Sequence, residues 1–393
     1  MSSTVFIISP TESILTKRGK RHPNLASFLV KKGVKIEYYT STINHAEKKK
    51  ICEEEINNAL KKSDYPITFF DAGLYKTNIT VKRVFWNIRF ANKVFWKLVR
   101  ESKKGDIIVF PSRPSELLLV GFILKKIKRI KLFLDVEDPW PDGFLINNKI
   151  IKFLFFSYCN ILNYISISSF DDGVHVSPSF LDWLKRYNHK FDSTFTPLGI
   201  TPDEDKPEFI KNYLEEPKII KFFYGGTLSL AFDILPILKA FSNNKQRFEL
   251  ILAGDDGSGN RYKAVHSFLI KNDIKHDSLG ILSKKDLINN LGKCDIAIVP
   301  MVVGGLPKKF FDAIGCHKPI LSLGSGGTSI EVKEKQMGWT SSFDSNEIIQ
   351  ILDEINKESL NNKINNIRIN RDYYFEQNSI NIITNKLKIM MNN

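Results

Sequence analysis

The stretch that decides the fold is CDIAIVPMVVGGLPKKFFDAIGCHKPILSLGSGGT, which runs from Cys294 to Thr328. Its order predicts a buried strand, a glycine loop, a helix, a second strand and a second glycine loop. The short apolar run Ile296–Val299 is typical of a parallel strand that is buried on both faces. Pro307 suits the first turn of the helix, where its missing N–H costs little, and Gly315 can end that helix.

Two glycine pairs in this stretch indicate an anion-binding site. Gly304 and Gly305 follow the first strand, and Gly326 and Gly327 open the helix after the second strand. Because ligands of open α/β sheets bind beyond the carboxyl ends of the strands, we expect both loops to line one crevice. Backbone N–H groups in such loops bind phosphate. The stretch therefore predicts a phosphate-bearing ligand.

The same stretch resembles the nucleotide-sugar-binding part of retaining glycosyltransferases of the GT-B fold, family 4, in particular bacterial enzymes that build surface polysaccharides. The shared pattern is a proline, a lysine, two apolar residues and an acid, then a small-residue turn, Lys-Pro and an apolar strand. This chain forms the pattern with Pro307, Lys308, Lys309, Phe310, Phe311, Asp312, Gly315, Lys318, Pro319 and Ile320. The resemblance implies that Asp312 binds the ribose hydroxyls of the nucleotide. Where the family places a second acid for the donor sugar, this chain has Gly304.

The length of 393 residues exceeds that of a usual single core and predicts two domains. Strands and helices alternate in both halves, which predicts two Rossmann-like units with parallel sheets. We expect a first domain at 1–195, which binds the acceptor, and a second domain at 196–370, which binds the nucleotide sugar. A helix at 371–393 is expected to cross back to the first domain. With the resemblance, the predicted fold class is α/β, GT-B, with two sheets that face a central cleft.

The resemblance also implies which residues of the second domain hold the donor. The expected donor-binding residues are Gly225, Gly226, Thr227, Leu279, Gly280, Gly304, Gly305, Lys309, Asp312, Gly326 and Gly327. The family carries an arginine where this chain has Thr227, and a lysine soon after it. Because neither is present before Lys239, we expect Lys309 to stabilise the leaving diphosphate, as a catalytic residue.

In the first domain, acidic residues directly follow a predicted strand at 131–136. They are Glu137 and Asp138, and the family has a similar acidic strand end before Trp-Pro, here Trp140 and Pro141. The resemblance implies a catalytic role for Asp138, and less so for Glu137: either carboxylate would bind the donor sugar or accept the acceptor's proton. Turn formation is the alternative, because Asp and Pro are favoured in turns.

A basic loop follows the first predicted strand, and the family places this loop toward the acceptor. The expected acceptor-binding residues are Lys17, Arg18, Gly19, Lys20, Arg21 and, after another strand, Arg113. A solvated loop explains the first five residues equally well.

The net charge of +14 lies entirely in the first half of the chain. Residues 1–190 hold 32 Lys and Arg against 18 Asp and Glu, whereas residues 191–393 hold 25 of each. Such an excess indicates an anionic partner, and we expect an anionic membrane surface. Helix 81–101 sets Trp86, Phe90 and Trp96 among basic residues, as interfacial helices do. A helix that covers a large core explains the same pattern.

These features predict a glycosyltransferase that moves a sugar, with retention, from a UDP- or GDP-linked donor to a hydroxyl of a lipid-linked or surface-polysaccharide acceptor. We expect a cytoplasmic protein at the inner face of the membrane, without signal peptide or membrane-spanning helix, and a buried helix at 152–164. No cofactor, no metal and no nucleic acid are expected, because no such motif occurs. The alternatives are a nucleotide-sugar 2-epimerase of the same fold and a non-catalytic protein that binds an anionic polymer.

Overall fold

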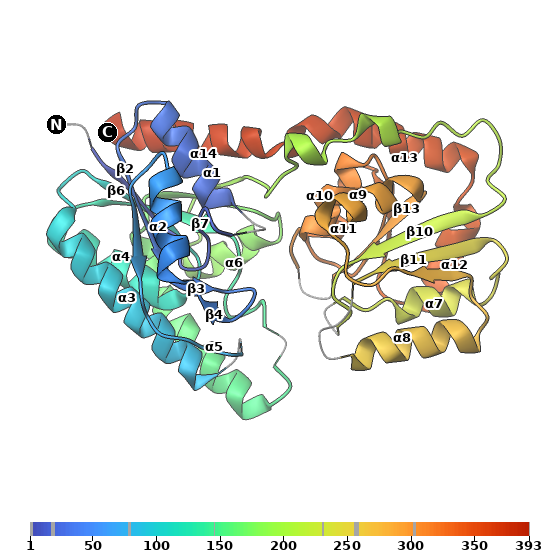
Figure 1. The fold of residues 1–393 in the computed structure, drawn as a ribbon, viewed down its shortest axis with the longest axis horizontal. Helices are drawn as coiled ribbons and strands as arrows, with labels where there is room; N and C mark the ends of the chain where they lie inside the picture. Colours follow the sequence, from blue (N-terminus) through green and yellow to red (C-terminus); the bar gives the residue numbers. More distant parts are fainter. Residues whose placement is uncertain are drawn as a thin grey trace. The chain divides into compact units, whose positions relative to one another are not determined.

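A computed structural model of the chain describes residues 3–16, 20–77, 80–144, 146–229, 232–254, 259–301 and 304–392. The chain divides into two compact units, each with its own parallel sheet (Figure 1). The first unit contains Met1–Val176, Phe180–Thr196 and Ile380–Asn393. The second contains Ser177–Ser179 and Pro197–Ser379.

The first unit is built on a seven-stranded sheet in the order β5-β2-β1-β6-β7-β8-β9, with parallel pairing throughout. Helices connect most of the strands, and a short antiparallel hairpin, β3–β4, follows β2. The elements are β1 (Val5–Ile8), α1 (Arg21–Lys31), β2 (Ile36–Ser41), β3 (Ile43–Asn44), β4 (Lys49–Lys50), α2 (Glu53–Lys62), β5 (Ile67–Phe70), α3 (Val81–Glu101), β6 (Ile107–Pro111), α4 (Ser115–Lys128), β7 (Lys131–Val136), α5 (Lys149–Ser166), β8 (Asp172–His175), α6 (Phe180–Tyr187), β9 (Ser193–Phe195) and α14 (Glu376–Asn392).

Helices cover both faces of this sheet. On one face, Leu29 of α1 and Leu387 of α14 share a core with Val5 and Ile7 of β1. On the other face, Phe90 of α3 packs edge-on against Phe70 of β5, with ring centroids 6.0 Å apart. Each such buried side chain contributes ~1.5–3 kcal/mol to folding. The C-terminal helix, although last in the chain, is therefore part of the first unit's core.

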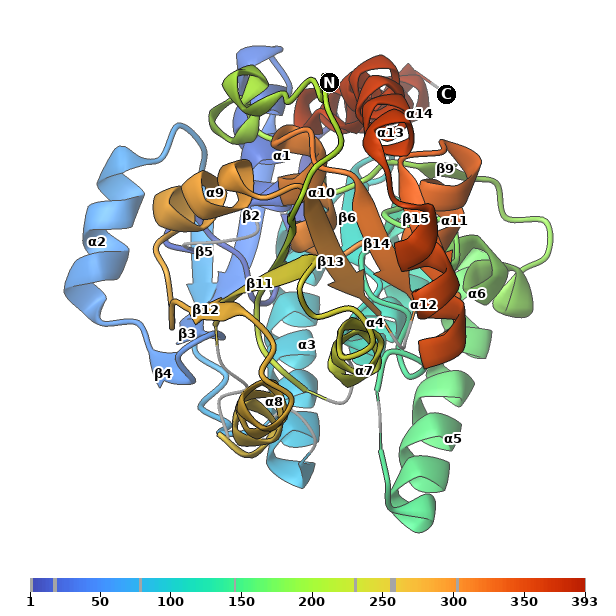
Figure 2. The same cartoon turned by 90° about the vertical axis from the view of Figure 1, so that its right-hand side faces the viewer.

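The second unit is built on a six-stranded sheet in the order β12-β11-β10-β13-β14-β15, again with parallel pairing. The strand order reverses between β10 and β13, which is where such sheets bind ligands. Figure 2 shows β13 and β14 side by side in this sheet. The elements are β10 (Ile220–Gly225), α7 (Leu235–Phe241), β11 (Phe248–Ala253), α8 (Asn260–Lys271), β12 (His276–Ser278), α9 (Lys284–Lys293), β13 (Ile296–Pro300), α10 (Lys308–Gly315), β14 (Ile320–Leu323), α11 (Gly327–Glu334), β15 (Gly338–Ser341), α12 (Ser345–Glu354) and α13 (Lys357–Asn370).

The aromatic residues of α3 do not all face outward. Trp86 and Phe90, which the sequence suggested for a membrane-facing surface, are buried, and their rings stack with centroids 5.5 Å apart. The indole N–H of Trp86 donates to the backbone oxygen of Gly73 at 3.1 Å. Only Trp96 of the three is exposed. The membrane interpretation was therefore wrong for Trp86 and Phe90, because they fill the core under the helix.

The expectation of a buried helix at 152–164 was also wrong. Most apolar side chains of α5 are exposed, with Ile150 at 72% and Phe153 at 70%. Among the helices of the described residues, the segment Lys149–Ser169 alone is long and apolar enough to cross a membrane, judged by length and composition, and 22% of its most apolar 18-residue stretch is buried. The search for an unbroken apolar run missed this helix, because Lys152, Ser157, Asn160 and Asn163 interrupt the run.

Candidate functional site

Three strands of the second unit end in loops that lie in backbone contact. β10 ends at Gly225, and Gly226 has a φ of +138°. A Cβ on Gly254, directly after β11, would lie 2.4 Å from the backbone oxygen of Gly226. The N–H of Gly254 in turn donates to the oxygen of Gly280 at 2.7 Å. The predicted donor-binding positions after β10 and β12 therefore lie together at the carboxyl edge of the sheet.

The two glycine loops of the stretch 294–328 contact each other directly. A Cβ on Gly326 would lie 2.4 Å from the Cα of Gly304. The N–H and the hydroxyl of Thr328 both donate to the oxygen of Gly305, at 3.1 and 3.0 Å. A Cβ on Gly304 would lie 3.0 Å from the hydroxyl of Ser179 and 3.3 Å from Gly326. This close approach leaves little room at position 304 for the acid that the family pattern has there.

Lys309 of α10 directs its amine toward the first glycine loop. A Cβ on Gly226 would lie 3.3 Å from this amine, so the amine is close to the loop backbone. The amine also lies over the aromatic rings of Tyr224 and Phe232, at 4.4 and 4.2 Å from the ring centroids. Burial lowers the pKa of Lys309 to about 7, and Asp312 opposes this shift. Within the part of the chain that is described, no carboxylate forms an ion pair with this amine. The sequence predicted Lys309 but not its aromatic support, which depends on residues far away in the chain.

Asp312, the predicted ribose ligand, already has a partner in the second unit. Its buried carboxylate is paired with Lys284 of α9. Lys284 also lies 3.2 Å from Glu204, which is 2.8 Å from Lys308. Burial raises the pKa of Asp312, while Lys284 acts in the opposite direction. Sequence reasoning missed Lys284 and Glu204; the one signal was the position of Lys284 directly after a Ser cap.

A hollow beside these groups brings several predicted residues together. It is lined by Gly225, Lys309, Asp312 and the apolar side chains of Phe223 and Leu287. Of the other predicted positions, Thr227 is exposed after the β10 loop, and Leu279 donates its N–H to Leu252 at 2.8 Å. The second unit thus combines glycine backbone, a positive charge and a carboxylate at one sheet edge, and such a set can bind a nucleoside diphosphate.

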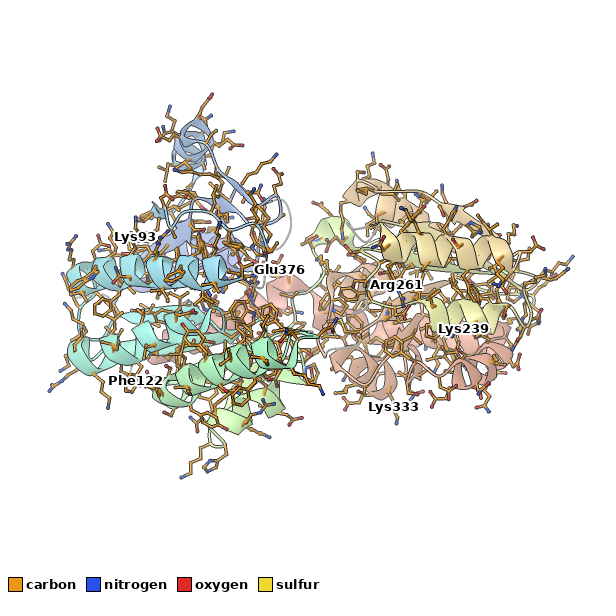
Figure 3. The ribbon with its side chains drawn as sticks, turned by 90° about the horizontal axis from the view of Figure 1, so that it is seen from below. Lys93, Phe122, Lys239, Arg261, Lys333 and Glu376 are labelled. Carbon is orange, nitrogen blue, oxygen red and sulfur yellow. The ribbon has the colours of Figure 1, made fainter. Side chains whose placement is uncertain are left out.

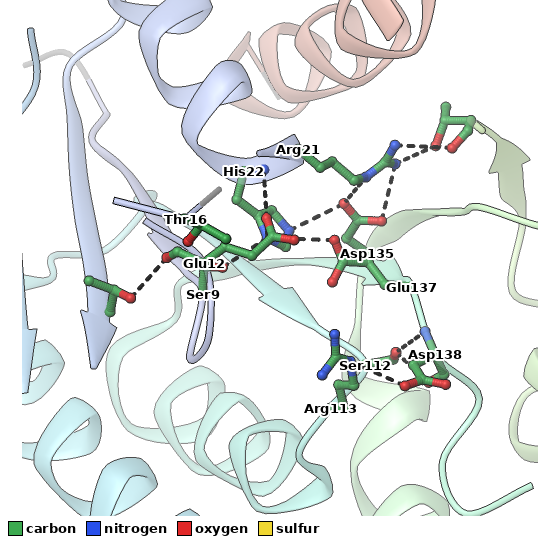
Figure 4. A network of polar contacts seen from close by, with 12 residues as sticks. Ser9, Glu12, Thr16, Arg21, His22, Ser112, Arg113, Asp135, Glu137 and Asp138 are labelled. Atoms are coloured by element: carbon green, nitrogen blue, oxygen red, sulfur yellow. Dashed lines mark hydrogen bonds and ion pairs between the residues drawn. The ribbon is translucent and has the colours of Figure 1, made fainter. Parts of the chain in front are cut away.

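A buried ion network occupies the carboxyl edge of the first sheet (Figure 4). Asp135 of β7 accepts from two nitrogens of Arg21, at 2.7 and 3.2 Å. Arg21 also donates to the oxygen and the hydroxyl of Thr196, at 3.1 and 2.7 Å. Arg21, predicted to bind the acceptor, therefore points into the protein instead. Lys20 beside it is exposed, and the predicted residues 17–19 lie outside the described residues.

His22 lies at the centre of this network. Its Nδ1 is 3.1 Å from the hydroxyl of Ser9, and its Nε2 is 3.3 Å from Asp135. Glu12 and Glu137 each approach Nδ1 to 3.8 Å. Burial alone would lower the pKa of His22, but the carboxylates, Glu137 foremost, raise it to about 9. Burial, with repulsion from Glu137, raises the pKa of Glu12 to about 8. Both shifts favour a charged imidazolium at His22 and a protonated carboxyl at Glu12.

Glu12, His22 and Glu137 are also the one group within the described ranges whose side chains could hold a metal ion, since their ligand atoms lie within 4.8 Å of one another. A metal requires a neutral imidazole, and the raised pKa of His22 opposes this state. The imidazolium itself supplies positive charge to the carboxylates around it. The donor set therefore fits a proton-bearing ion network better than a metal. Sequence spacing did not reveal the group, because Glu12 and His22 meet only through the fold.

Glu137 and Asp138 differ in their access to solvent. Glu137 is 10% exposed and faces His22, whereas the side chain of Asp138 is 42% exposed. Arg113 places its Nε 3.4 Å from the Asp138 carboxylate. The hydroxyl of Ser112 donates to the backbone oxygen of Asp138 at 2.7 Å. Asp138 is therefore the accessible carboxylate of the pair, and Ser112, directly after β6, holds its backbone.

A cavity of about 740 Å³ adjoins this network within the first unit. Its lining is mainly polar and comes from the loop after β1, the end of β2 and the β3–β4 hairpin. The lining includes Glu12, Thr16, Thr40, Asn44, His45 and Arg113. Hydroxyl, amide and carboxyl groups of this kind can hydrogen-bond a polyhydroxylated ligand.

Comparisons with known proteins agree with the predicted fold. No protein-family model matches the chain. It is 23% identical over 263 residues to the probable glycosyltransferase WbjE of Pseudomonas aeruginosa, a match that spans 62% of this chain and 64% of that protein. The chain thus covers less than two thirds of this relative.

Solved structures match nearly the whole chain. Sucrose-phosphate synthase of Thermosynechococcus elongatus superposes with a TM-score of 0.73 at 14% identity, over 99% of both chains. HepE of Anabaena in complex with UDP superposes with a TM-score of 0.67 at 12% identity, over 98% of this chain and 99% of that one. The chain has the GT-B fold. The predicted fold class and the resemblance to GT-B glycosyltransferases are thereby confirmed.

A third GT-B structure is WaaG, a glycosyltransferase involved in lipopolysaccharide biosynthesis. It matches with a TM-score of 0.59 at 12% identity, over 97% of this chain and 99% of that one. At such identities the likeness extends to the fold, and the roles of individual residues stay predictions. In the GT-B fold of this chain, both candidate regions lie at the carboxyl edges of their sheets.

Proposed function

We propose that the chain is a glycosyltransferase that moves a sugar, with retention, from a UDP- or GDP-linked donor to a hydroxyl of a lipid-linked or surface-polysaccharide acceptor. The observation that carries the proposal is Lys309, a desolvated amine aimed at a glycine loop. Its environment suits an incoming diphosphate, which would raise its pKa by supplying negative charge. The GT-B fold and the similarity to WbjE, and to HepE with bound UDP, support the same reaction class.

In the donor half, backbone groups at Gly225 and Gly226 would approach the diphosphate. Lys309 would stabilise the charge that develops on it as the glycosidic bond breaks. Asp312 would accept hydrogen bonds from the ribose, with Lys284 holding the carboxylate in place. Because Gly304 stands where the family has an acid, other groups would contact the donor sugar.

In the acceptor half, the polar cavity of the first unit would hold the acceptor. Asp138 would align its hydroxyl or accept its proton. Arg113, whose Nε lies 3.4 Å from the carboxylate, would hold Asp138 in place. Arg21 and His22 act indirectly in this proposal: they fix the end of β7, and with it the segment that carries Glu137 and Asp138.

The proposed reaction uses no metal and no organic cofactor. The proposed location is the inner face of the cytoplasmic membrane, to which the basic first half would be attracted. Chelation would leave the activity unchanged if Glu12, His22 and Glu137 form an ion network, and would abolish it if they hold an essential metal.

The test is incubation of the purified chain with a panel of UDP- and GDP-sugars, with and without a membrane extract as acceptor. We expect release of the nucleoside diphosphate to depend on both donor and acceptor, and Asp138→Asn to reduce it strongly. Asp142→Asn is a matched control, because Asp142 pairs with Arg186 at the surface. Conversion of one nucleotide sugar into another without acceptor would instead favour an epimerase. Nuclear magnetic resonance of the product reports the anomeric configuration and thus retention.

A further inference from the structure

Three helices of the first unit form one layer whose outer side is apolar and basic. α4 packs between α3 and α5, and the three helices lie side by side in Figures 1 and 3, where Lys93 marks α3 and Phe122 marks α4. We call their outward side the three-helix face. The exposed large apolar side chains of these helices include Phe85, Ile88, Trp96, Ile123, Ile127, Ile150, Phe153, Leu154 and Ile161. So many exposed apolar groups on neighbouring helices mark an interaction surface.

The charge of this layer is predominantly positive. The helices α3, α4 and α5 carry 11 Lys and Arg but only two acidic residues, Glu101 and Glu116. Glu116 is buried and accepts from Tyr158 at 2.9 Å, so it adds little negative charge to the surface. The exposed basic residues are Lys82, Arg89, Lys93, Arg100, Lys126, Lys149 and Lys152. A partner must therefore be both apolar and anionic.

α5 supplies the most exposed part of the three-helix face. Ile150, Leu154 and Ile161 recur at helical spacing along one side of it, and Phe153 and Ile151 widen its first turns. In Figure 2 these N-terminal turns lie at the lower tip of the drawing, beyond the neighbouring helices. Lys149 and Lys152 flank the apolar group. This is the composition of a helix that lies in a membrane interface.

The inner side of α5 ties the helix to the domain. Cys159 is buried, and the amide of Asn163 donates to the backbone oxygen of Trp140 at 2.9 Å. Trp140 also packs edge-on against Phe155, with ring centroids 6.0 Å apart. Crossing a membrane would break these contacts, so the geometry favours a helix that lies flat in the interface, despite its length and apolar composition.

We infer that the three-helix face docks on an anionic lipid bilayer, with the first turns of α5 inserted among the acyl chains. This inference deepens the proposed peripheral location and rests on it. A second copy of the chain is a poorer occupant, because two such faces would bring like charges together. Anionic headgroups over an apolar interior match both properties of the face.

Docking would also position the segment that carries Asp138 for the proposed reaction. The segment after β7 carries Asp138 and, two residues later, Trp140, which contacts α5 through Phe155 and Asn163. A bilayer that holds α5 therefore fixes the segment that bears the accessible carboxylate. A lipid-linked acceptor would present its hydroxyl from the same bilayer.

The test is co-sedimentation of the full chain with vesicles of phosphatidylcholine alone or with phosphatidylglycerol. At 0.1 M salt we expect much stronger binding to the anionic vesicles than to phosphatidylcholine alone. At 1 M salt the charge attraction is screened, so binding to the anionic vesicles should fall to the weak level that apolar insertion of α5 gives on both kinds of vesicle. The combined Ile150→Ser, Phe153→Ser and Leu154→Ser variant should bind at least ~10-fold more weakly and lose the salt-resistant part. Charge reversal at Lys93, Lys126 and Lys152 should remove the salt-sensitive part.

Matched controls come from exposed isoleucines of the second unit. Ile270→Ser, Ile281→Ser and Ile369→Ser remove similar apolar surface and should bind vesicles as the wild type does. A Phe153→Trp variant adds a direct readout, since lipids with brominated chains should quench its fluorescence more than that of the wild type. These variants should keep the wild-type affinity for the nucleotide donor.

Two results would overturn the inference. Vesicle binding that is unchanged in the triple serine variant would exclude α5 as the inserted element. A wild-type dimer that the same variant converts to a monomer, measured by light scattering, would identify a second copy as the occupant. The proposed reaction is tested separately. If the chain binds vesicles as expected but turns over no nucleotide sugar, the three-helix face is confirmed as a membrane-binding surface and the proposed transferase activity is wrong.

Discussion

The two candidate regions differ in whether their buried charges are paired with charges of opposite sign. In the first unit, Asp135 lies between Arg21 and His22, so the protein supplies every partner of the charge itself. In the second unit, the amine of Lys309 is desolvated over two aromatic rings and has no carboxylate in ion-pair contact among the described residues. A charge that is fully paired holds a fold together. A charge that is desolvated without a pair costs stability, and a ligand of opposite charge can compensate it.

This contrast predicts a structural role for the first network and a ligand-binding role for the second region. The first network fixes the end of β7 and thereby the position of Glu137 and Asp138. The second leaves positive potential beside Gly226, where a diphosphate would be bound. Variants of the paired network around Asp135 should therefore damage folding, whereas variants of Lys309 should damage ligand binding or turnover.

The largest expected effect is on stability, from Asp135→Asn. This change leaves the charges of Arg21 and His22 buried without their carboxylate, and breaking such a buried pair costs ~3–5 kcal/mol. Urea denaturation measures the free energy of unfolding. Asp142→Asn, which breaks the half-exposed pair with Arg186, should cost less than ~1 kcal/mol. If both variants lose only a similar, small amount of unfolding free energy, the network does not stabilise the fold.

Lys309→Met should lower kcat by ~10²–10³, because the amine interacts most strongly with charge that develops in the transition state. The free energy of unfolding should stay the same or increase, since the variant removes a desolvated amine. Affinity for a nucleoside monophosphate should change little. The control is Lys333→Met at an exposed position. A loss of stability without a loss of turnover would assign Lys309 to the core instead of the reaction.

Asp312→Asn should weaken nucleotide binding by ~1.5–3 kcal/mol, because a charge-assisted hydrogen bond to the ribose is lost. Calorimetry with the nucleoside diphosphate measures this change. Asp286→Asn on the neighbouring α9 is the control, since its carboxylate accepts from Ser283 at the surface. Unchanged affinity in Asp312→Asn would mean that the carboxylate serves only to pair with Lys284.

The smallest expected effect is a pH dependence of donor affinity. Because the pKa of Lys309 is about 7, the amine is mostly charged at pH 6 and mostly neutral at pH 8. Affinity for a nucleotide sugar should therefore fall as pH rises through 7, by up to ~10-fold per unit above the pKa. The diphosphate diester of the ligand does not titrate in this range. Lys309→Arg should flatten the profile, and a wild-type profile that is already flat would contradict the lowered pKa.

The same comparison explains where sequence reasoning succeeded. The glycine loops and the Pro-Lys-Lys helix are local patterns, and they correctly predicted the GT-B fold and brought Lys309, Asp312 and the loop at Gly225 together. Glu12, His22 and Asp135 were missed, because each lies in a different local context and the three meet only through the sheet edge. Arg21 was predicted as part of a basic loop, yet its guanidinium points inward to a carboxylate more than a hundred residues away.

Hydrophobic periodicity likewise predicted where these helices lie in the chain, but not which of their side chains are buried. α3 and the region of α5 were both predicted as helices, but Trp86 proved to be buried and Phe153 exposed. A sequence states which side chains share a helix face. Which face meets the sheet depends on the neighbouring helices, and only the tertiary structure supplies them.

The sequence by itself therefore determined the alternation of strands and helices, the glycine loops and the excess of positive charge in the first half, because these properties are local or additive. Only the tertiary structure decided which charges are paired, which amine is left for a ligand and which apolar side chains remain outside. Burial and pairing depend on groups that are distant in the chain, and they set the pKa of Lys309 and the exposure of α5.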